Sequence, residues 1–326
     1  MKNILLVNDT SLTLHYGCDL LMMNIYNLLD KNNINLIGSI YHEEKIIVSN
    51  NNLNKIKKSD VILINGEGTL HRKKNSDQIK VDEIINFISH VKRTFKKKVI
   101  IFNATFAKLN SNDFKILKLV DKIFVRENIS KKYLKLNKLD SVFLPDLTLL
   151  SKNSRLHKSF ELVTTDSSVK EFNQKLKKFS KIYKSQYYKM LHHTGFGKIS
   201  KLIVLQIYKM FPSCKIDKLF IFFKRDLAKK FFKEISKSKF ILTGRFHCIC
   251  FCIVNYIPFF SLAGDTHKVS GLLEDVRMQN RLLENRSLLK SNLNFKNFSI
   301  NEKKQISKIL KLTKLRSKLL IKIIKR

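Results

Sequence analysis

Short apolar runs and amphipathic segments alternate along this 326-residue chain, and no other feature constrains the fold as strongly. Runs such as Lys2–Val7 and Val61–Ile64 end at polar or glycine residues, as buried parallel strands do before a loop. The segment Gly17–Leu29 carries apolar residues at helical spacing. Strands that alternate with helices form a parallel sheet covered on both faces, so we expect an α/β fold.

The alternation occurs in two sets. The first set predicts further strands at 34–40, 98–102, 122–125 and 141–144, and helices at 78–93, 113–119 and 129–136. A polar, basic stretch at 151–159 follows Pro145-Asp146 and predicts a hinge. The second set predicts strands at 161–165, 240–243 and 258–262, an apolar helix after Arg245, a helix from about 267, and a mostly helical segment at 173–232.

We therefore predict two doubly wound domains, 1–150 and 151–300, that face each other across a cleft. Ligands of open parallel sheets bind at the carboxyl ends of the strands, so the loops that follow strands are the candidate sites. The tail, 301–326, has one apolar face and basic residues elsewhere, which predicts an amphipathic helix that packs on the protein or lies on a membrane.

The net charge of +37 favours attraction to polyanions. The sequence has no zinc-finger spacing, RNA-binding sheet motif or arginine-rich arm, so we expect no specific nucleic-acid partner and consider an anionic membrane surface instead. An odd number of cysteines, five, predicts reduced thiols in the cytoplasm, and their spacing predicts no metal site. Neither a signal peptide nor a membrane-spanning run is expected.

The loop "VNDTSLTLHYGCD" follows the first predicted strand and crowds polar side chains before a helix. We predict that Asp9, His15 and Tyr16 contact a substrate there. The alternative is that Asp9 and Thr10 only cap backbone amides.

The loop "VILINGEGTLHR" places Gly66 and Gly68 on either side of Glu67. Glycines allow a ligand close to the backbone and leave amides free for an anion, although a tight turn would give the same pattern. The loop lacks the Lys-Ser/Thr of a nucleoside-triphosphate site and the third glycine of a dinucleotide site, so neither cofactor is expected.

Two further strand ends carry charged residues. Arg126 ends a buried strand and can hold a carboxylate or phosphate at the cleft rim, unless it pairs with Glu127 or another acid. Asp146 follows the last strand of the first set, where a ligand contact and a Pro-Asp turn are equally compatible with the pattern.

The stretch "TGRFHCICFCIVNY" begins an almost wholly apolar helix with Arg245 and His247 in its first turn. Thr243 and Gly244 form the preceding turn. The helix amides and dipole already favour an anion there, so an arginine beside them calls for a bound negative charge. The alternative is a structural salt bridge beside a buried histidine.

At these residues the chain resembles the polysaccharide pyruvyl transferase family. The motifs are "INGEGTLH", "VRENIS" followed by "LPDLTLL", and "TGRFHCICFCIVNYIPFFSLAGDTHKVSGLLED", in that order. The family's usual leucine between the arginine and the histidine is Phe246 here. The resemblance implies two Rossmann-like halves of the GT-B glycosyltransferase type, with the acceptor on the N-terminal and the donor on the C-terminal half.

The resemblance also implies phosphoenolpyruvate as donor substrate, no cofactor, and transfer of pyruvate as a cyclic ketal to a sugar of a cell-surface polysaccharide or a lipid-linked precursor. His247 would then contact phosphate and deliver a proton, Arg126 and Arg245 would clamp the anion, and Glu67 or Asp9 would be the base. The alternatives are a glycosyltransferase using a CMP- or UDP-linked sugar and a non-catalytic component of polysaccharide assembly at the membrane.

Overall fold

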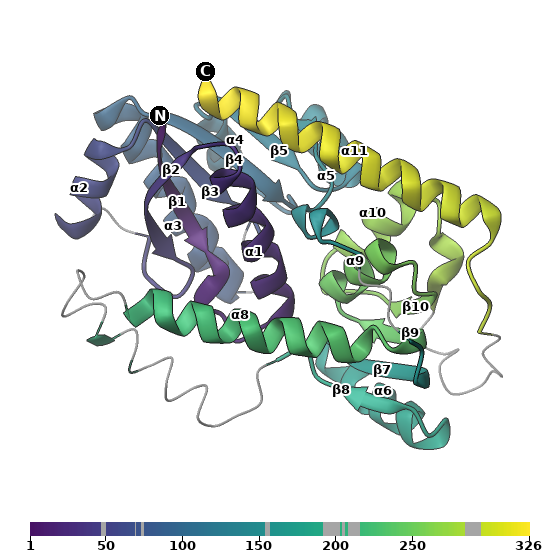
Figure 1. The fold of residues 1–326 in the computed structure, drawn as a ribbon. Helices are drawn as coiled ribbons and strands as arrows, with labels where there is room; N and C mark the ends of the chain where they lie inside the picture. Colours follow the sequence, from purple (N-terminus) through teal and green to yellow (C-terminus); the bar gives the residue numbers. More distant parts are fainter. Residues whose placement is uncertain are drawn as a thin grey trace. The chain divides into compact units, whose positions relative to one another are not determined.

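The computed structural model describes residues 1–46, 50–68, 70–72, 75–153, 157–191, 216–283 and 295–326, together with the single positions 203, 206 and 207. Its strands form two sheets (Figure 1). Neighbouring strands are parallel throughout both sheets. The α/β fold with two parallel sheets is therefore confirmed.

The first sheet has six strands in the order β2-β1-β3-β4-β5-β6. They are β1 (Asn3–Asp9), β2 (Asn35–Tyr41), β3 (Val61–Asn65), β4 (Lys98–Ala104), β5 (Lys122–Val125) and β6 (Val142–Phe143). The connecting helices are α1 (Tyr16–Asp30), α2 (Asn50–Lys58), α3 (Asn75–His90), α4 (Ser111–Leu117) and α5 (Asn128–Leu136). The winding direction reverses between β1 and β3, which makes their carboxyl ends the switch point where such sheets bind ligands.

Alternate side chains of these strands point to opposite faces of the sheet, and both faces are buried. Leu5 and Val7 of β1 pack with apolar residues of α2–α5 in one core, while Ile4 and Leu6 on the other face are equally buried. This explains why the strands read as uninterrupted apolar runs in the sequence.

The second sheet has five strands in the order β11-β10-β9-β7-β8. They are β7 (Phe160–Ser167), β8 (Gln186–Tyr188), β9 (Ser238–Gly244), β10 (Phe259–Leu262) and β11 (Leu282–Leu283). The helices are α6 (Lys170–Ile182), α8 (Ile216–Ile235), α9 (Phe246–Asn255) and α10 (Lys268–Asp275). Its winding reverses between β7 and β9, so each sheet has its own switch point.

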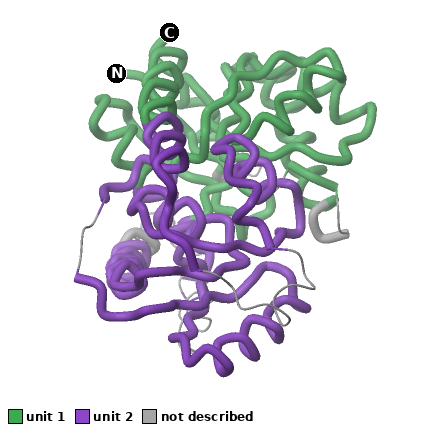
Figure 2. The backbone as a smooth tube through the Cα atoms, turned by 90° about the vertical axis from the view of Figure 1, so that its right-hand side faces the viewer, with its two compact units in different colours: residues 1–10, 24–147, 311–326 green, residues 11–23, 148–310 purple. Residues whose placement is uncertain are grey.

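The chain divides into two compact units (Figure 2). Unit 1 contains Met1–Thr10, Asn24–Leu147 and Lys311–Arg326, and unit 2 contains Ser11–Met23 and Thr148–Leu310. The change between them at Leu147 lies close to the predicted boundary at 150, but the first half of α1 belongs to unit 2. The predicted arrangement of two domains across a cleft stays a prediction.

The helix α11 (Ile300–Lys325) forms where the sequence predicts an amphipathic helix, at 301–326. Its first part belongs to unit 2 and its second part to unit 1. The elements α2, β8 and β11 were not predicted, because α2 is rich in asparagine and lysine and the two strands are only two or three residues long. Part of the predicted helical segment 173–232, residues 192–202, 204–205 and 208–215, and part of the predicted hinge, residues 154–156, lie outside the described residues.

Three cysteines of the apolar helix α9, Cys248, Cys250 and Cys252, are buried free thiols, as expected. Burial raises the pKa of the Cys252 thiol. Within the residues that the structure describes, no helix is both long and apolar enough to span a membrane.

Candidate active site

The switch point of the second sheet, in unit 2, carries an ion pair. Asp166, near the end of β7, accepts hydrogen bonds from Nε of Arg245 at 3.0 Å and from one of its terminal nitrogens. Asp166 also accepts the amide N–H of Met190 at 2.9 Å. The negative charge that Arg245 requires is therefore supplied within the protein by Asp166. Because the Arg245 side chain stays 14% exposed, it can still face a ligand.

The turn that leads into α9 is held by its own side chains. The Thr243 hydroxyl accepts the amide N–H of Arg245 at 3.0 Å and is hydrogen-bonded to the Thr165 hydroxyl. A Cβ at Gly244 would lie 2.3 Å from the Cβ of Ser167, so only glycine fits between β9 and β7. Thr243 and Gly244, both predicted to bind substrate, thus fix the backbone that presents Arg245 and His247.

His15 caps the N-terminus of α1. Its Nδ1 accepts the amide N–H groups of Gly17 at 3.0 Å and Cys18 at 3.4 Å. A neutral imidazole has one donor and one acceptor nitrogen, so this arrangement puts the proton on Nε2. His15 is therefore a hydrogen-bond donor at Nε2, which suits contact with an anion better than the role of a base.

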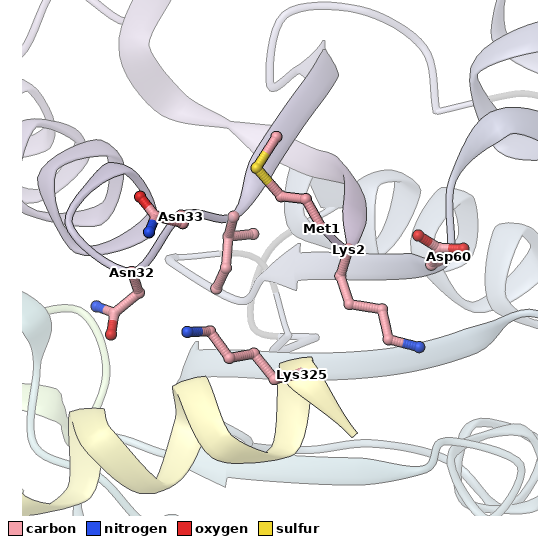
Figure 3. Close-up of a pocket in the computed structure, with 7 residues that line it drawn as sticks. Met1, Lys2, Asn32, Asn33, Asp60 and Lys325 are labelled. Atoms are coloured by element: carbon pink, nitrogen blue, oxygen red, sulfur yellow. The ribbon is translucent and has the colours of Figure 1, made fainter.

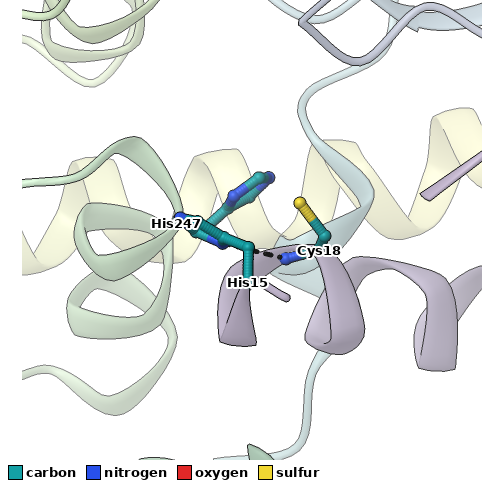
Figure 4. Close-up of side chains that lie close together, drawn as sticks. All are labelled: His15, Cys18 and His247. Atoms are coloured by element: carbon teal, nitrogen blue, oxygen red, sulfur yellow. Dashed lines mark hydrogen bonds between the residues drawn. The ribbon is translucent and has the colours of Figure 1, made fainter. Parts of the chain in front are cut away.

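His247 lies directly against the first turn of α1 (Figure 4). A Cβ at Gly17 would be 2.5 Å from the His247 Cβ and 2.6 Å from its Nδ1, so the imidazole occupies the space that any other residue at position 17 would fill. The centroids of the two imidazole rings are 5.9 Å apart. The site thus brings together the first turns of α1 and α9 and the imidazoles of His15 and His247. The His247 side chain is buried there, with only 7% of the residue exposed.

Cys18 joins the two histidines in a cluster that could hold a metal ion. One ligand atom from each of His15, Cys18 and His247 lies within 4.8 Å of the others. Two imidazoles and a thiolate suit zinc or copper. A metal bound to Nδ1 of His15 would displace the amide hydrogen bonds that cap α1. A metal bound to Nε2 would force the imidazole proton onto Nδ1, which would break the same hydrogen bonds. The cap therefore opposes a resident metal at this cluster.

Two tyrosines lie beside these groups. Burial, and to a lesser extent the Asp19 carboxylate, raises the pKa of Tyr16, whose ring stacks on Phe231 at 4.3 Å between centroids. Burial, followed by the Asp166 carboxylate, raises the pKa of Tyr187 to about 12. Tyr16, predicted to bind substrate, has its ring engaged in packing.

The switch point of the first sheet, in unit 1, brings two predicted carboxylates to adjacent strands. The Thr10 hydroxyl donates to Oε2 of Glu67 at 2.8 Å, and the Tyr26 hydroxyl donates to Asp9. Glu67 is 7% exposed and Asp9 is fully buried. Thr10 therefore donates a hydrogen bond to a side chain, whereas the alternative from the sequence was that it only caps backbone amides.

The glycines beside Glu67 have different roles. The Gly66 amide N–H donates to the Phe102 carbonyl at 2.8 Å, and a Cβ at position 66 would lie 2.4 Å from the Cβ of Ala104. This amide is therefore used by the sheet and does not cradle an anion, contrary to the prediction. Gly68 has a φ of 65° and open space around its Cα.

Arg126 and Asp146, also in unit 1, pair with each other. Nη1 of Arg126 lies 3.2 Å from Oδ2 of Asp146, and its Nε donates to the Thr105 hydroxyl at 2.7 Å. The side chains are 2% and 0% exposed. The Arg126 guanidinium is therefore buried and neutralised by a neighbouring acid, which is the alternative that the sequence left open, and its contact with a substrate stays a prediction.

Unit 1 also has a hollow of about 630 Å³, which the candidate site residues do not line (Figure 3). Lys2, Asn33 and Asp60 line it beside Lys325 at the end of α11. Asn33 and Asp60 come just before β2 and β3, so the hollow is at the amino ends of the strands and not at the carboxyl ends, where ligands of such sheets bind.

The predicted residues thus form two groups, one in each unit. Unit 2 holds His15, Tyr16, Thr243, Gly244, Arg245 and His247, and unit 1 holds Asp9, Gly66, Glu67, Gly68, Arg126 and Asp146. Sequence analysis missed Asp166, Gly17 and Cys18. Asp166 directly follows the predicted strand 161–165, which is the same signal that pointed to Arg126. Nothing in the sequence marks Gly17 as the neighbour of His247.

One comparison with a solved structure agrees with the fold, and two weaker likenesses are given beside it. A functionally uncharacterised protein from Klebsiella pneumoniae superimposes with a TM-score of 0.52 at 12% identity, over 87% of this chain and 93% of that one. An α-glucosyltransferase in complex with UDP gives 0.48 at 10% identity, over 99% and 95%. The UDP-N-acetylglucosamine 2-epimerase of Rickettsia bellii gives 0.44 at 11% identity, over 100% and 98%.

In sequence, no curated protein matches the chain. The family model for polysaccharide pyruvyl transferase matches residues 15–266, a range that begins at the histidine capping α1 and includes Arg245 and His247. This range covers more than half of the chain and contains the motifs at the ends of β3, β5 and β9. The chain therefore belongs to the polysaccharide pyruvyl transferase family and is a transferase.

Proposed function

We propose that this transferase takes pyruvate from phosphoenolpyruvate and forms a cyclic ketal on a sugar of a cell-surface polysaccharide or of its lipid-linked precursor. The observation that carries the proposal is the meeting of two helix N-termini around His247 in unit 2. Phosphoenolpyruvate bears a phosphate and a carboxylate. The first-turn amides of α1 are already used by His15 and Met190. The groups that suit the phosphate and the carboxylate are therefore the imidazoles of His15 and His247, the Arg245 guanidinium and the positive end of the α9 dipole.

In the proposed reaction, His247 delivers a proton to C3 of phosphoenolpyruvate while C2 gains oxocarbenium character. A sugar hydroxyl adds to C2 and gives its proton to a carboxylate, for which Glu67 and Asp9 are the candidates. The bond between C2 and the phosphate oxygen then breaks. A second hydroxyl adds to C2 and closes the ring, and its proton passes to the departed phosphate, so the products are the ketal and hydrogen phosphate. The protein's own side chains supply the charges, and no cofactor is invoked.

Asp166 acts as a positioning residue in this scheme. Two hydrogen bonds from Arg245 hold the guanidinium in one orientation, and the Met190 amide fixes the carboxylate in turn. Since Asp166 already neutralises part of the arginine charge, His15 and His247 carry more of the phosphate binding than the arginine does.

The first test is a thermal-shift titration with phosphoenolpyruvate, CMP and UDP in parallel. A ligand that binds only the native state raises the melting temperature with concentration. Phosphoenolpyruvate should do so, and His247→Asn should weaken its binding by about tenfold or more, since a charge-assisted hydrogen bond contributes roughly 1.5–3 kcal/mol. His90→Asn changes an exposed imidazole in unit 1 and is the matched control. Stabilisation by CMP or UDP alone would indicate a sugar-nucleotide donor instead.

We also propose that the protein works in the cytoplasm and binds peripherally to the inner face of an anionic membrane. The support is the net charge of +37, which attracts anionic lipid, and a lipid-linked acceptor, as proposed above, would give the association a function. Sedimentation with vesicles that contain phosphatidylglycerol, but not with pure phosphatidylcholine vesicles, is the expected result. Absence of sedimentation with both types of vesicle would refute the association.

A further inference from the structure

The helix α8, labelled in Figure 1, belongs to unit 2. It exposes an unusual set of side chains. Four large apolar residues in its N-terminal and middle turns are 48–67% exposed: Leu219, Phe222, Phe223 and Leu227. The next two turns expose three lysines, Lys229, Lys230 and Lys233, of which Lys230 pairs with Asp226 at 2.9 Å. At 100° per residue these side chains share one side of the helix.

Exposed apolar residues followed along the helix by exposed lysines suit a surface that inserts into the interfacial region of an anionic bilayer. Phenylalanine and leucine insert among the acyl chains, while lysine ammonium groups remain at the level of the lipid phosphates. Each lysine near such a surface contributes on the order of 1 kcal/mol. We propose that this face of α8 is the membrane-docking surface of the protein, and the inference rests on the peripheral association proposed above.

The tail helix α11 is the obvious rival, but most of its apolar stripe is not available. Ile306, Ile309, Leu320 and Ile324 are buried in the protein. In the middle of the helix, Leu315 is 62% exposed and is surrounded by exposed lysines. The exposed side of α11 can attract anionic lipid electrostatically, but its large exposed apolar residues, Ile300 (85%) and Leu315 (62%), stand singly along the helix and form no continuous apolar patch.

The opposite side of α8 is tied to the candidate active site. Lys224, which is 3% exposed, donates to Oδ1 of Asp19 at 2.9 Å, to the Ser11 carbonyl at 2.8 Å and to the Thr13 carbonyl. This segment leads into His15 and the first turn of α1. A bilayer bound to the outer face of α8 would therefore lie on the helix that holds the His15 loop, which places a lipid-linked acceptor near the chemistry.

The chain has no tryptophan, so one introduced tryptophan is a unique reporter. We would compare full-length Phe223→Trp with Leu315→Trp, which places the reporter on α11. With vesicles containing phosphatidylglycerol, the emission of the α8 reporter should shift to the blue and be quenched by brominated acyl chains, whereas the α11 reporter should change little. Insertion of the α11 reporter alone would overturn the inference and leave the membrane association standing.

Substitution gives the second arm. Phe222→Ser combined with Phe223→Ser should weaken vesicle binding by about tenfold or more, and a triple Lys→Gln change at 229, 230 and 233 by a similar factor. The matched control removes three exposed lysines of α11, at 304, 308 and 311. If the control lowers binding as much as the α8 variant does, charge and not location matters, and the assignment of α8 fails.

Two outcomes distinguish a membrane-docking surface from a dimer interface and from a part of the catalytic machinery. If the Phe222/Phe223 variant keeps its vesicle binding but loses a dimer seen by analytical ultracentrifugation, the face is an interface between copies, and the proposal is wrong. If vesicle binding is lost while the phosphoenolpyruvate thermal shift is unchanged, the docking surface is supported independently of the reaction.

Discussion

Replacing Gly17 by alanine tests the most specific contact of the candidate site. The new Cβ would lie 2.5–2.7 Å from three atoms of His247, about 1 Å closer than ordinary van der Waals contact. Because the nearest of these atoms is the His247 Cβ, rotation of the imidazole cannot relieve the clash, and the first turn of α9 must shift away from α1 and carry His247 with it. A hydrogen bond stretched by ~1 Å is effectively lost.

The loss of one such bond to a charged ligand is worth roughly 1.5–3 kcal/mol, which corresponds to about a tenfold to 150-fold weaker affinity for phosphoenolpyruvate. The free energy of unfolding should also fall, by about 1–3 kcal/mol, which is the usual cost of forcing an extra methyl group into a packed region. Isothermal titration calorimetry measures the affinity, and urea unfolding measures the stability.

Gly38→Ala is the control, since its Cβ would meet only the flexible Lys55 side chain, at 3.2 Å or more. Wild-type affinity in folded Gly17→Ala would refute the reasoning that His247 must lie against α1 to bind the donor. An equal loss of affinity in Gly38→Ala would show that glycine replacement in general, and not the contact with His247, causes the effect.

Three further outcomes are expected. Asp166→Ala should lower the free energy of unfolding by about 3 kcal/mol in urea titrations, because it leaves the largely buried Arg245 guanidinium without its carboxylate, and an unchanged urea midpoint would contradict this role. The pKa of Tyr187 is raised to about 12 in the folded protein, so the contribution of Tyr187 to the free energy of unfolding is complete below pH 10 and is lost as the pH rises towards 12. The urea midpoint of Tyr187→Phe should therefore fall less between neutral and strongly alkaline pH than that of the unsubstituted protein. An equal fall in both proteins would count against this role of Tyr187. Added zinc should inhibit through the cluster with Cys18, and Cys18→Ser should relieve this inhibition, whereas stoichiometric zinc in protein purified without added metal would show that the ion is resident.

The order of strands and helices could be read from the sequence with errors of only a few residues at most element ends. A strand buried on both faces must be apolar throughout, as the VILIN run of β3 is, and a helix between strands must carry an apolar stripe. The same local rules failed for β8, which lies within a segment predicted to be helical, and for β11, whose two leucines are flanked by charged residues.

The candidate residues were predictable for a related reason. Parallel sheets bind ligands where strands end, so polar residues in those loops, such as Glu67 and His247, stand out against apolar neighbours. Their partners did not stand out. Asp166 and Arg245 are 79 residues apart in the chain, and either could have faced a ligand or a counter-ion.

By itself, the sequence determined the fold class, the position of the apolar helix α9 and the motifs that identify the family, because each depends on local pattern. Only the tertiary structure decided that Arg126 is neutralised by Asp146, that Arg245 is oriented by Asp166, and that Gly17 makes room for His247. The physical reason is that strand order and helix packing choose which distant side chains meet, and the pairing of charges follows from that choice.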